Sequence, residues 1–384
     1  MKKLMKLLSY ILVAAVASAA TFFLTEEVPT MNSMKLAQLE ALITEKFIGE
    51  VDETAIGDAA AVGMVSALDD RWSYYLSAAE YGDYLDRMDN SYVGVGITIQ
   101  VAEDYSGFNI LQVSTGGPAE EAGLLPGDKL VGVEGQNVAG WSSTDVATLV
   151  KGEEHTYVSM TVLRAGEEKT FSVERRRVQT PVAEAQLLNG HIGYVTIVNF
   201  DNRCADETVA AIEDMLAQGA DMLLFDVRHN PGGYADELVK VLDYLLPEGE
   251  LFRTVDYAGK EEVDMSDANC LELPMAVLVN GDSYSAAEFF AAALREYGVA
   301  TVVGNQTVGK GYFQRTYQLL DGSAVGISVG KYFTPNGISL AEVGGITPDV
   351  EVEVTEEEAF GIYAGTLDPM DDPQVLAAIA ELEK

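Results

Sequence analysis

Cysteine, histidine and basic residues are scarce in this chain of 384 residues. The two cysteines, Cys204 and Cys270, form no C-x-x-C pair. This argues against a thiolate metal site and leaves open either one disulfide or two buried free thiols. Only 24 lysines and arginines oppose 61 aspartates and glutamates, a formal net charge of −37 at pH 7. Because such a surface repels polyanions, we expect no nucleic-acid partner.

The first 30 residues differ in residue pattern from the rest of the chain. Three lysines, at positions 2, 3 and 6, precede an uncharged run over residues 7–24. Basic residues followed by an apolar run are typical of a secretory signal peptide or a signal anchor. The small residues "VASAA" offer a cleavage site near Ala19, whereas the continuation of the run through Leu24 favours an uncleaved membrane anchor. We therefore expect the body of the protein to lie outside the cytoplasm, in the extracellular space or the periplasm.

The length and the changing residue patterns predict a multidomain α+β protein. A helical region after the anchor ends in the aromatic segment "DDRWSYYLSAAEYGDYL", whose rings either form an ordinary core face or pair two subunits. Short strands between glycine turns follow, with one helix at residues 143–150, and then strands alternate with helices. The predicted parts are a signal anchor or signal peptide (1–30), a helical region (31–90), a β-rich module (91–176), an α/β domain (177–366) and a C-terminal helix (367–384).

Lys310 lies in the segment "VGNQTVGKGYFQ", which has the glycine-to-lysine spacing of a nucleotide-binding P-loop. A P-loop needs Ser or Thr after the lysine and a helix that meets the phosphates. Here Gly311 follows the lysine, and the next residues are typical of a strand. Both requirements fail, so the sequence favours a second use of lysine, as a general base whose pKa is lowered by burial.

A serine nucleophile for such a base is available in "VLVNGDSYSAAEFFAAAL". An apolar strand over residues 276–279 runs through a tight turn into an alanine-rich helix. Ser283 and Ser285 both lie at this corner, where helix N–H groups favour a developing oxyanion. From the local pattern alone, either serine could instead be a helix N-cap.

A glycine pair completes the set of groups needed for acyl transfer. In "FDVRHNPGGYADE", Gly232 and Gly233 follow an apolar strand, and paired glycines let backbone N–H groups approach a substrate carbonyl. Serine, lysine and glycine pair together predict a Ser-Lys acyl-transfer enzyme. His229 adjoins the pair and leaves a Ser-His arrangement open as an alternative.

These segments, in this order, resemble the C-terminal processing peptidases, also called tail-specific proteases, which carry a PDZ domain ahead of a Ser-Lys catalytic domain. The resemblance covers most of the chain. "NGDSYSAAE" is similar to the family's serine segment and implies that Ser285 is the nucleophile. "VGKGYFQ" is similar to its lysine segment and implies Lys310 as general base, with Gln314 orienting it. The fold implied for residues 177–366 is an α/β core of the crotonase or ClpP type.

The segment "DVRHNPGG" resembles the family's glycine motif and implies the backbone amides of Gly232, Gly233 and Ala286 as oxyanion donors. The chain departs from the family pattern in two places. Tyr284 and Ala287 replace an alanine and a serine, and His229 stands where asparagine is common. None of these removes a catalytic group, although Tyr284 can narrow or gate the cleft.

The β-rich module resembles PDZ domains. "YVGVGI" is similar to their carboxylate-binding loop and implies that Val95, Gly96 and Ile97 offer N–H groups to a peptide C-terminus, with the peptide then adding as a strand. "GGPAEEAGLLPGDKLVGVEGQNV" is similar to their helix, turn and strand.

The resemblance implies a membrane-anchored serine endopeptidase that acts on proteins or peptides with accessible C-terminal tails. It implies no metal or organic cofactor, and a homodimer through the helical region. The alternative from another class is a catalytically inactive PDZ scaffold or chaperone on the same fold.

Overall fold

The computed structural model describes residues 30–384, so the predicted anchor lies outside the described residues. The chain divides into two compact units, one ending at Asp69 and one spanning Asp70–Lys384. In the first unit, helices α2 (Met31–Lys46) and α3 (Glu53–Ser66) start at side-chain caps, Thr30 and Asp52. From residue 30 onward, none of the helices has the length and apolar character needed to cross a membrane.

The second unit begins with strand β1 (Tyr74–Leu76) and helix α4 (Ala78–Met88). Ser77 and Glu80 form a capping box at the start of α4. Strand β2 (Ser91–Gly94) then pairs with β9 (Arg176–Gln179), so the entry and exit of the β-rich module lie side by side.

The β-rich module has its own sheet and its own core. Its antiparallel sheet has the order β3-β4-β5-β7-β8, with β6 paired to β5, and its core includes Phe108, Ile110, Leu130 and Met160. Helix α6 spans Ser143–Val150, as the sequence predicts. The remaining elements are β3 (Ile97–Val101), β4 (Phe108–Val113), α5 (Pro118–Ala122), β5 (Lys129–Val133), β6 (Gln136–Asn137), β7 (Tyr157–Arg164) and β8 (Glu167–Glu174).

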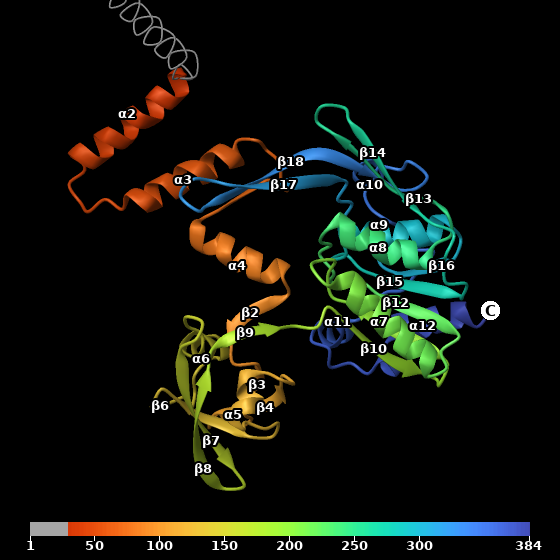
Figure 1. The fold of residues 1–384 in the computed structure, drawn as a ribbon, viewed down its shortest axis with the longest axis horizontal. Helices are drawn as coiled ribbons and strands as arrows, with labels where there is room; N and C mark the ends of the chain where they lie inside the picture. The colour runs from red at the N-terminus through yellow and green to blue at the C-terminus, as the bar shows by residue number, and fades with distance from the viewer. Residues whose placement is uncertain (1–29) are drawn as a thin grey trace, which may run out of the picture. The chain divides into compact units, whose positions relative to one another are not determined.

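The α/β core is a six-stranded sheet of order β10-β11-β12-β15-β16-β19, in which only β10 is antiparallel to its neighbour. Its central strands are buried on both faces and alternate between two cores. Leu223 and Phe225 pack in the core that contains residues of helices α7, α8 and α9, whereas Leu224 packs in the core that contains residues of α12. Figure 1 shows the sheet with these helices. The elements are β10 (Ala183–Leu188), β11 (Ile192–Ile197), α7 (Cys204–Ala217), β12 (Met222–Asp226), α8 (Ala235–Leu245), β15 (Met275–Val279), α9 (Ala286–Glu296), β16 (Ala300–Gly304), β19 (Val350–Glu351) and α12 (Pro373–Leu382).

A second sheet, of order β1-β18-β13-β14 with β17 paired to β18, completes this unit. The mixed α/β multidomain architecture predicted from the sequence is therefore confirmed. The loops that carry the predicted site residues follow β12, β15 and β16 at the carboxyl edge of the parallel strands, where open α/β sheets usually place their sites. The remaining elements are β13 (Gly249–Asp256), β14 (Glu261–Ser266), β17 (Tyr312–Gln318), β18 (Ala324–Phe333), α10 (Leu340–Val343), α11 (Glu356–Tyr363) and a 3-10 turn (Pro369–Asp371).

Candidate active site

Ser285 occupies the corner between the turn after β15 and helix α9. Its backbone has φ 58° and ψ −126°, a conformation that a residue with a side chain rarely adopts. Such backbone strain costs about 1–3 kcal/mol and is characteristic of functional turns. The side chain is almost buried, at 5% exposure. The corner therefore places one hydroxyl beside the N-terminus of α9.

Ser283 has a structural environment that Ser285 lacks. Its hydroxyl donates to the Val227 carbonyl over 2.7 Å and accepts from the Asn280 N–H over 3.0 Å. It is fully buried. These bonds join the serine turn to the loop after β12, so the structure separates the two serines that the local sequence pattern leaves equivalent.

Gly232 packs directly against the serine corner, and Gly233 packs against the backbone of Phe200. A Cβ atom at Gly232 would lie 2.7 Å from the Cβ of Ser285, and one at Gly233 would lie 2.2 Å from the carbonyl carbon of Phe200, so neither position has room for a side chain. The Gly232 N–H donates to Asn230 Oδ1 over 2.8 Å. Among residues 30–384, the N–H groups of Gly233 and Ala286 have no such acceptor. The role of Gly232, Gly233 and Ala286 as oxyanion donors stays a prediction, and the Gly232 N–H already has an acceptor.

Glu288 joins the serine corner to the lysine loop. The backbone N–H groups of Ser285 and Lys310 both donate to its Oε2 atom, over 3.0 and 2.8 Å. The two backbone nitrogens therefore lie within about 6 Å of each other. Glu288 was not among the site residues predicted from the sequence, although Ser285-Ala-Ala-Glu288 has the S-x-x-E spacing of a capping box.

Lys310 is partly buried against aromatic rings. Its Nζ atom lies 4.8 Å from the ring centre of Trp72 and 5.9 Å from that of Tyr284. Burial lowers the pKa of Lys310 to about 8, while the charges of Glu288 and Asp70 act in the opposite direction. A neutral amine, the form that accepts a proton, is therefore present in a useful fraction near neutral pH.

Gln314 lies on β17, next to a shift in the pairing of β17 with β18. Its Nε2 atom donates to Ser328 Oγ over 3.0 Å and to the Tyr312 carbonyl over 3.2 Å. No hydrogen bond joins it to Lys310 in the part of the chain that the structure describes. Orientation of Lys310 by Gln314 stays a prediction.

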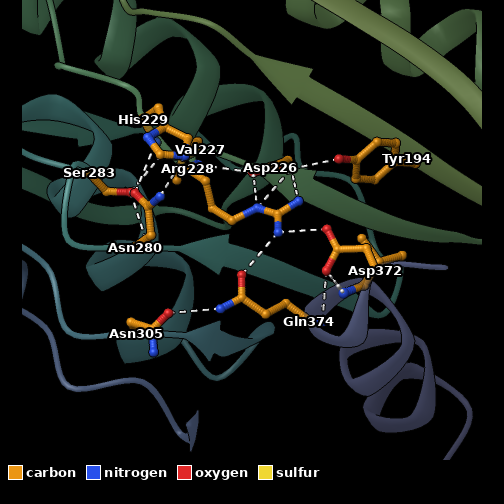
Figure 2. Close-up of polar contacts among 11 residues, drawn as sticks. Tyr194, Asp226, Val227, Arg228, His229, Asn280, Ser283, Asn305, Asp372 and Gln374 are labelled. Atoms are coloured by element: carbon orange, nitrogen blue, oxygen red, sulfur yellow. Dashed lines mark hydrogen bonds and ion pairs between the residues drawn. The ribbon is translucent and has the colours of Figure 1, made fainter. Parts of the chain in front are cut away.

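Figure 2 shows a network of polar contacts around the buried side chain of Arg228. Arg228, after β12, pairs with Asp226 over 2.6 Å and with Asp372 at the start of α12 over 2.7 Å. It also donates to Gln374, which donates in turn to Asn305 at the start of the lysine loop. All members of the Arg228, Asp226 and Asp372 group are buried. The network fixes the glycine and lysine loops to α12.

His229 interacts with the serine turn and not with the candidate nucleophile. Its Nδ1 atom lies 3.0 Å from Asp282 Oδ2, and its Nε2 atom lies 3.0 Å from Asn280 Nδ2. Its backbone N–H donates to Asn280 Oδ1. With both ring nitrogens engaged there, the Ser-His alternative has no support from the geometry.

The predicted peptide-binding residues Val95, Gly96 and Ile97 lie at the entrance of β3, an edge strand of the module's sheet. The Val95 and Gly96 carbonyls accept from Ala119 and Ser114. An edge strand can pair with an added peptide strand. Binding of a C-terminal carboxylate at this loop stays a prediction.

The serine corner, the lysine loop and the β-rich module define the class as a serine peptidase with an attached PDZ-like domain. Comparisons with known proteins agree. Residues 191–352 match the model of peptidase family S41, and residues 110–164 match that of the PDZ domain. The chain is 30% identical over 370 residues to the carboxy-terminal processing protease CtpA of Bacillus subtilis (strain 168), covering 93% of this chain and 79% of that protein.

The chain therefore belongs to peptidase family S41, and within it to the C-terminal processing peptidases. It is also 28% identical over 371 residues to a CtpA-like serine protease of Staphylococcus aureus (strain COL), covering 94% of this chain and 74% of that protein. A crystal structure described as an S41 protease of Bacteroides fragilis shares the fold, with a TM-score of 0.57 and 17% identity over 93% of this chain and 98% of that one.

Proposed function

We propose that this peptidase is an exported endopeptidase, anchored in the cytoplasmic membrane, that cleaves proteins with accessible C-terminal tails. Ser285 is the nucleophile and Lys310 is the general base. Gln314, on the strand that follows the lysine, orients it. The PDZ domain binds the C-terminal tail at the loop that contains Val95, Gly96 and Ile97, and the bound peptide pairs with β3 as an added strand.

In the proposed mechanism, the neutral amine of Lys310 accepts the proton of the Ser285 hydroxyl while Oγ attacks the scissile carbonyl carbon. The tetrahedral oxyanion lies against backbone N–H groups of the corner, of which those of Gly233 and Ala286 have no other acceptor in the described chain. The Lys310 ammonium then protonates the leaving amine. Water, deprotonated by Lys310, hydrolyses the acyl-enzyme and restores the Ser285 hydroxyl.

The observation that carries this proposal is the shared carboxylate oxygen of Glu288. It holds the backbones of Ser285 and Lys310 close together, although 24 residues separate the two positions. An inactive scaffold has no need for a lysine held in this way with a pKa of about 8.

The test is cleavage of casein and of a fluorogenic peptide with an apolar C-terminus by a chain that begins at Met31. Ser285→Ala and Lys310→Ala are each expected to lower kcat by at least about 1,000-fold while tail-peptide affinity stays unchanged. Wild-type protein that binds a tail peptide but cleaves neither substrate would favour the scaffold alternative.

The helical region predicted over 31–90 contains strand β1 in the structure, and its helices up to Asp69 belong to the first unit. This first unit supports a further part of the proposal, a homodimer. Side chains of the first unit that are large, apolar and exposed include Met34, Leu39, Leu42, Phe47 and Ile48. Exposed apolar surface of this kind is typical of an interface.

A further inference from the structure

Glu288 accepts four hydrogen bonds, all of them from the two segments assigned to catalysis. Its Oε2 atom accepts from the N–H groups of Ser285 and Lys310. Its Oε1 atom accepts from the Gly309 N–H over 2.7 Å and from the Thr307 hydroxyl. The side chain is fully buried.

These contacts favour the carboxylate form of Glu288. The Thr307 hydroxyl accepts a hydrogen bond from the Ile346 N–H over 2.8 Å, so its own hydrogen is directed at Glu288. Each carboxylate oxygen then faces two donors, which leaves no position for a carboxyl proton. Burial raises the pKa of Glu288, and the four hydrogen bonds oppose that rise. The donors at both oxygens favour the carboxylate form of Glu288, in opposition to burial.

The charged groups around Lys310 come from two elements. Glu288 lies on α9, and Asp70 and Arg71 precede β1. The rings of Trp72 and Tyr284 cover the ammonium group. Of the two anions, Glu288 alone accepts from the backbone of Lys310, whereas Asp70 accepts from Ser73 and Trp72. The charge of Glu288 raises the pKa of Lys310, against the larger lowering that burial causes.

We propose that Glu288 is a positioning residue of the peptidase centre: its carboxylate fixes the backbones of Ser285 and Lys310 to each other and places a negative charge beside the lysine amine. This inference rests on the proposed function. It predicts two separable effects, because the hydrogen bonds control geometry and the charge controls the proton affinity of Lys310.

The substitutions Glu288→Gln and Glu288→Asp separate these effects. Glu288→Gln removes the charge and replaces one carboxylate oxygen by an NH₂ group, which faces N–H donors. Glu288→Asp keeps the charge on a shorter side chain. Both are expected to lower kcat by at least about 10-fold, because each disturbs the position of the two loops. Only Glu288→Gln is expected to move the acid limb of the kcat/KM profile to lower pH, by roughly one unit.

The matched control is Glu358→Gln. Glu358 forms the same capping box with Thr355 at the start of α11 and accepts from the Thr355 N–H over 2.7 Å. Within residues 30–384 it bonds to neither the serine corner nor the lysine loop. The substitution is expected to leave kcat and the pH profile unchanged. If Glu288→Gln and Glu358→Gln changed kcat and the pH profile alike, the cause would be the loss of a capping box in general, and the inference would be overturned.

A measurement without catalysis keeps this test independent of the proposed function. In a Ser285→Ala background, the titration of Lys310 is followed by NMR of ¹³C-labelled lysine, with the signal assigned through Lys310→Ala. The midpoint is expected to fall in Glu288→Gln and to stay within about 0.3 units in Glu358→Gln. An unchanged midpoint in Glu288→Gln overturns the inference even if the chain is active. If the midpoint falls in Glu288→Gln while the wild-type chain hydrolyses no substrate, the role of Glu288 is supported and the proposed function is refuted.

Discussion

Burial lowers the pKa of Lys310 to about 8, and in the proposed mechanism its neutral amine accepts the proton of Ser285. We therefore expect kcat/KM to rise with pH, with a midpoint near 8, and to level off above it. A pH profile between about pH 6 and pH 10 measures this. A midpoint near 6.5, the ordinary value for histidine, would point to His229 instead.

The two serines of the corner are expected to respond differently to loss of the hydroxyl. Because the Ser283 hydroxyl is buried and holds two hydrogen bonds, Ser283→Ala is expected to lower the free energy of unfolding by about 1–3 kcal/mol. Ser285→Ala is expected to abolish cleavage while changing stability by less than about 0.5 kcal/mol. Urea denaturation and casein cleavage, measured on both variants, check this. Equal loss of activity with equal loss of stability would contradict the assignment of Ser285.

At the scale of secondary-structure elements, the ion pairs of Arg228 connect the end of β12 to the start of α12. Arg228→Met leaves two buried carboxylates without their countercharge, so we expect a loss of about 3–5 kcal/mol in the free energy of unfolding. The exposed Arg315 provides the control, because Arg315→Met is expected to change the free energy of unfolding by less than about 0.5 kcal/mol. Denaturant midpoints for both variants measure the difference, and similar midpoints would show that the network adds little.

At the scale of the whole molecule, the proposed anchor predicts where the chain is found after cell fractionation. The full chain is expected to stay with membranes through an alkaline carbonate wash and to require detergent for extraction, because residues 7–24 are uncharged and largely apolar. A chain that begins at Met31 is expected in the soluble fraction. Full-length protein released by carbonate alone would refute the anchor.

The proposed homodimer also belongs to this scale. Leu39→Glu places a charge on the exposed apolar surface of α2, and it is expected to convert a dimer into a monomer. Light scattering coupled to size exclusion, on chains that begin at Met31, measures the mass. A monomeric wild-type chain, or a Leu39→Glu variant that stays dimeric, would place the interface elsewhere or exclude it.

The sequence by itself was sufficient for the order of the elements and for the residue types of the site. Glycine turns, apolar strands and helix periodicity are local signals, so helix α6 and the strand before the serine corner were predicted within a residue. Gly311, the residue after Lys310, distinguishes this segment from a P-loop, which has Ser or Thr at that position. The resemblance to the C-terminal processing peptidases rests on the same short segments.

Tertiary structure decided which of these groups meet. Ser283 was equivalent to Ser285 in the local pattern until the fold paired its hydroxyl with Val227, more than 50 residues earlier. The Gly232 amide, a predicted oxyanion donor, turned out to be bonded to Asn230. Glu288 was not predicted as a site residue, and only the packing of α9 against the lysine loop makes it a shared acceptor. Contacts between segments distant in the chain depend on packing of the whole core, which no local pattern contains.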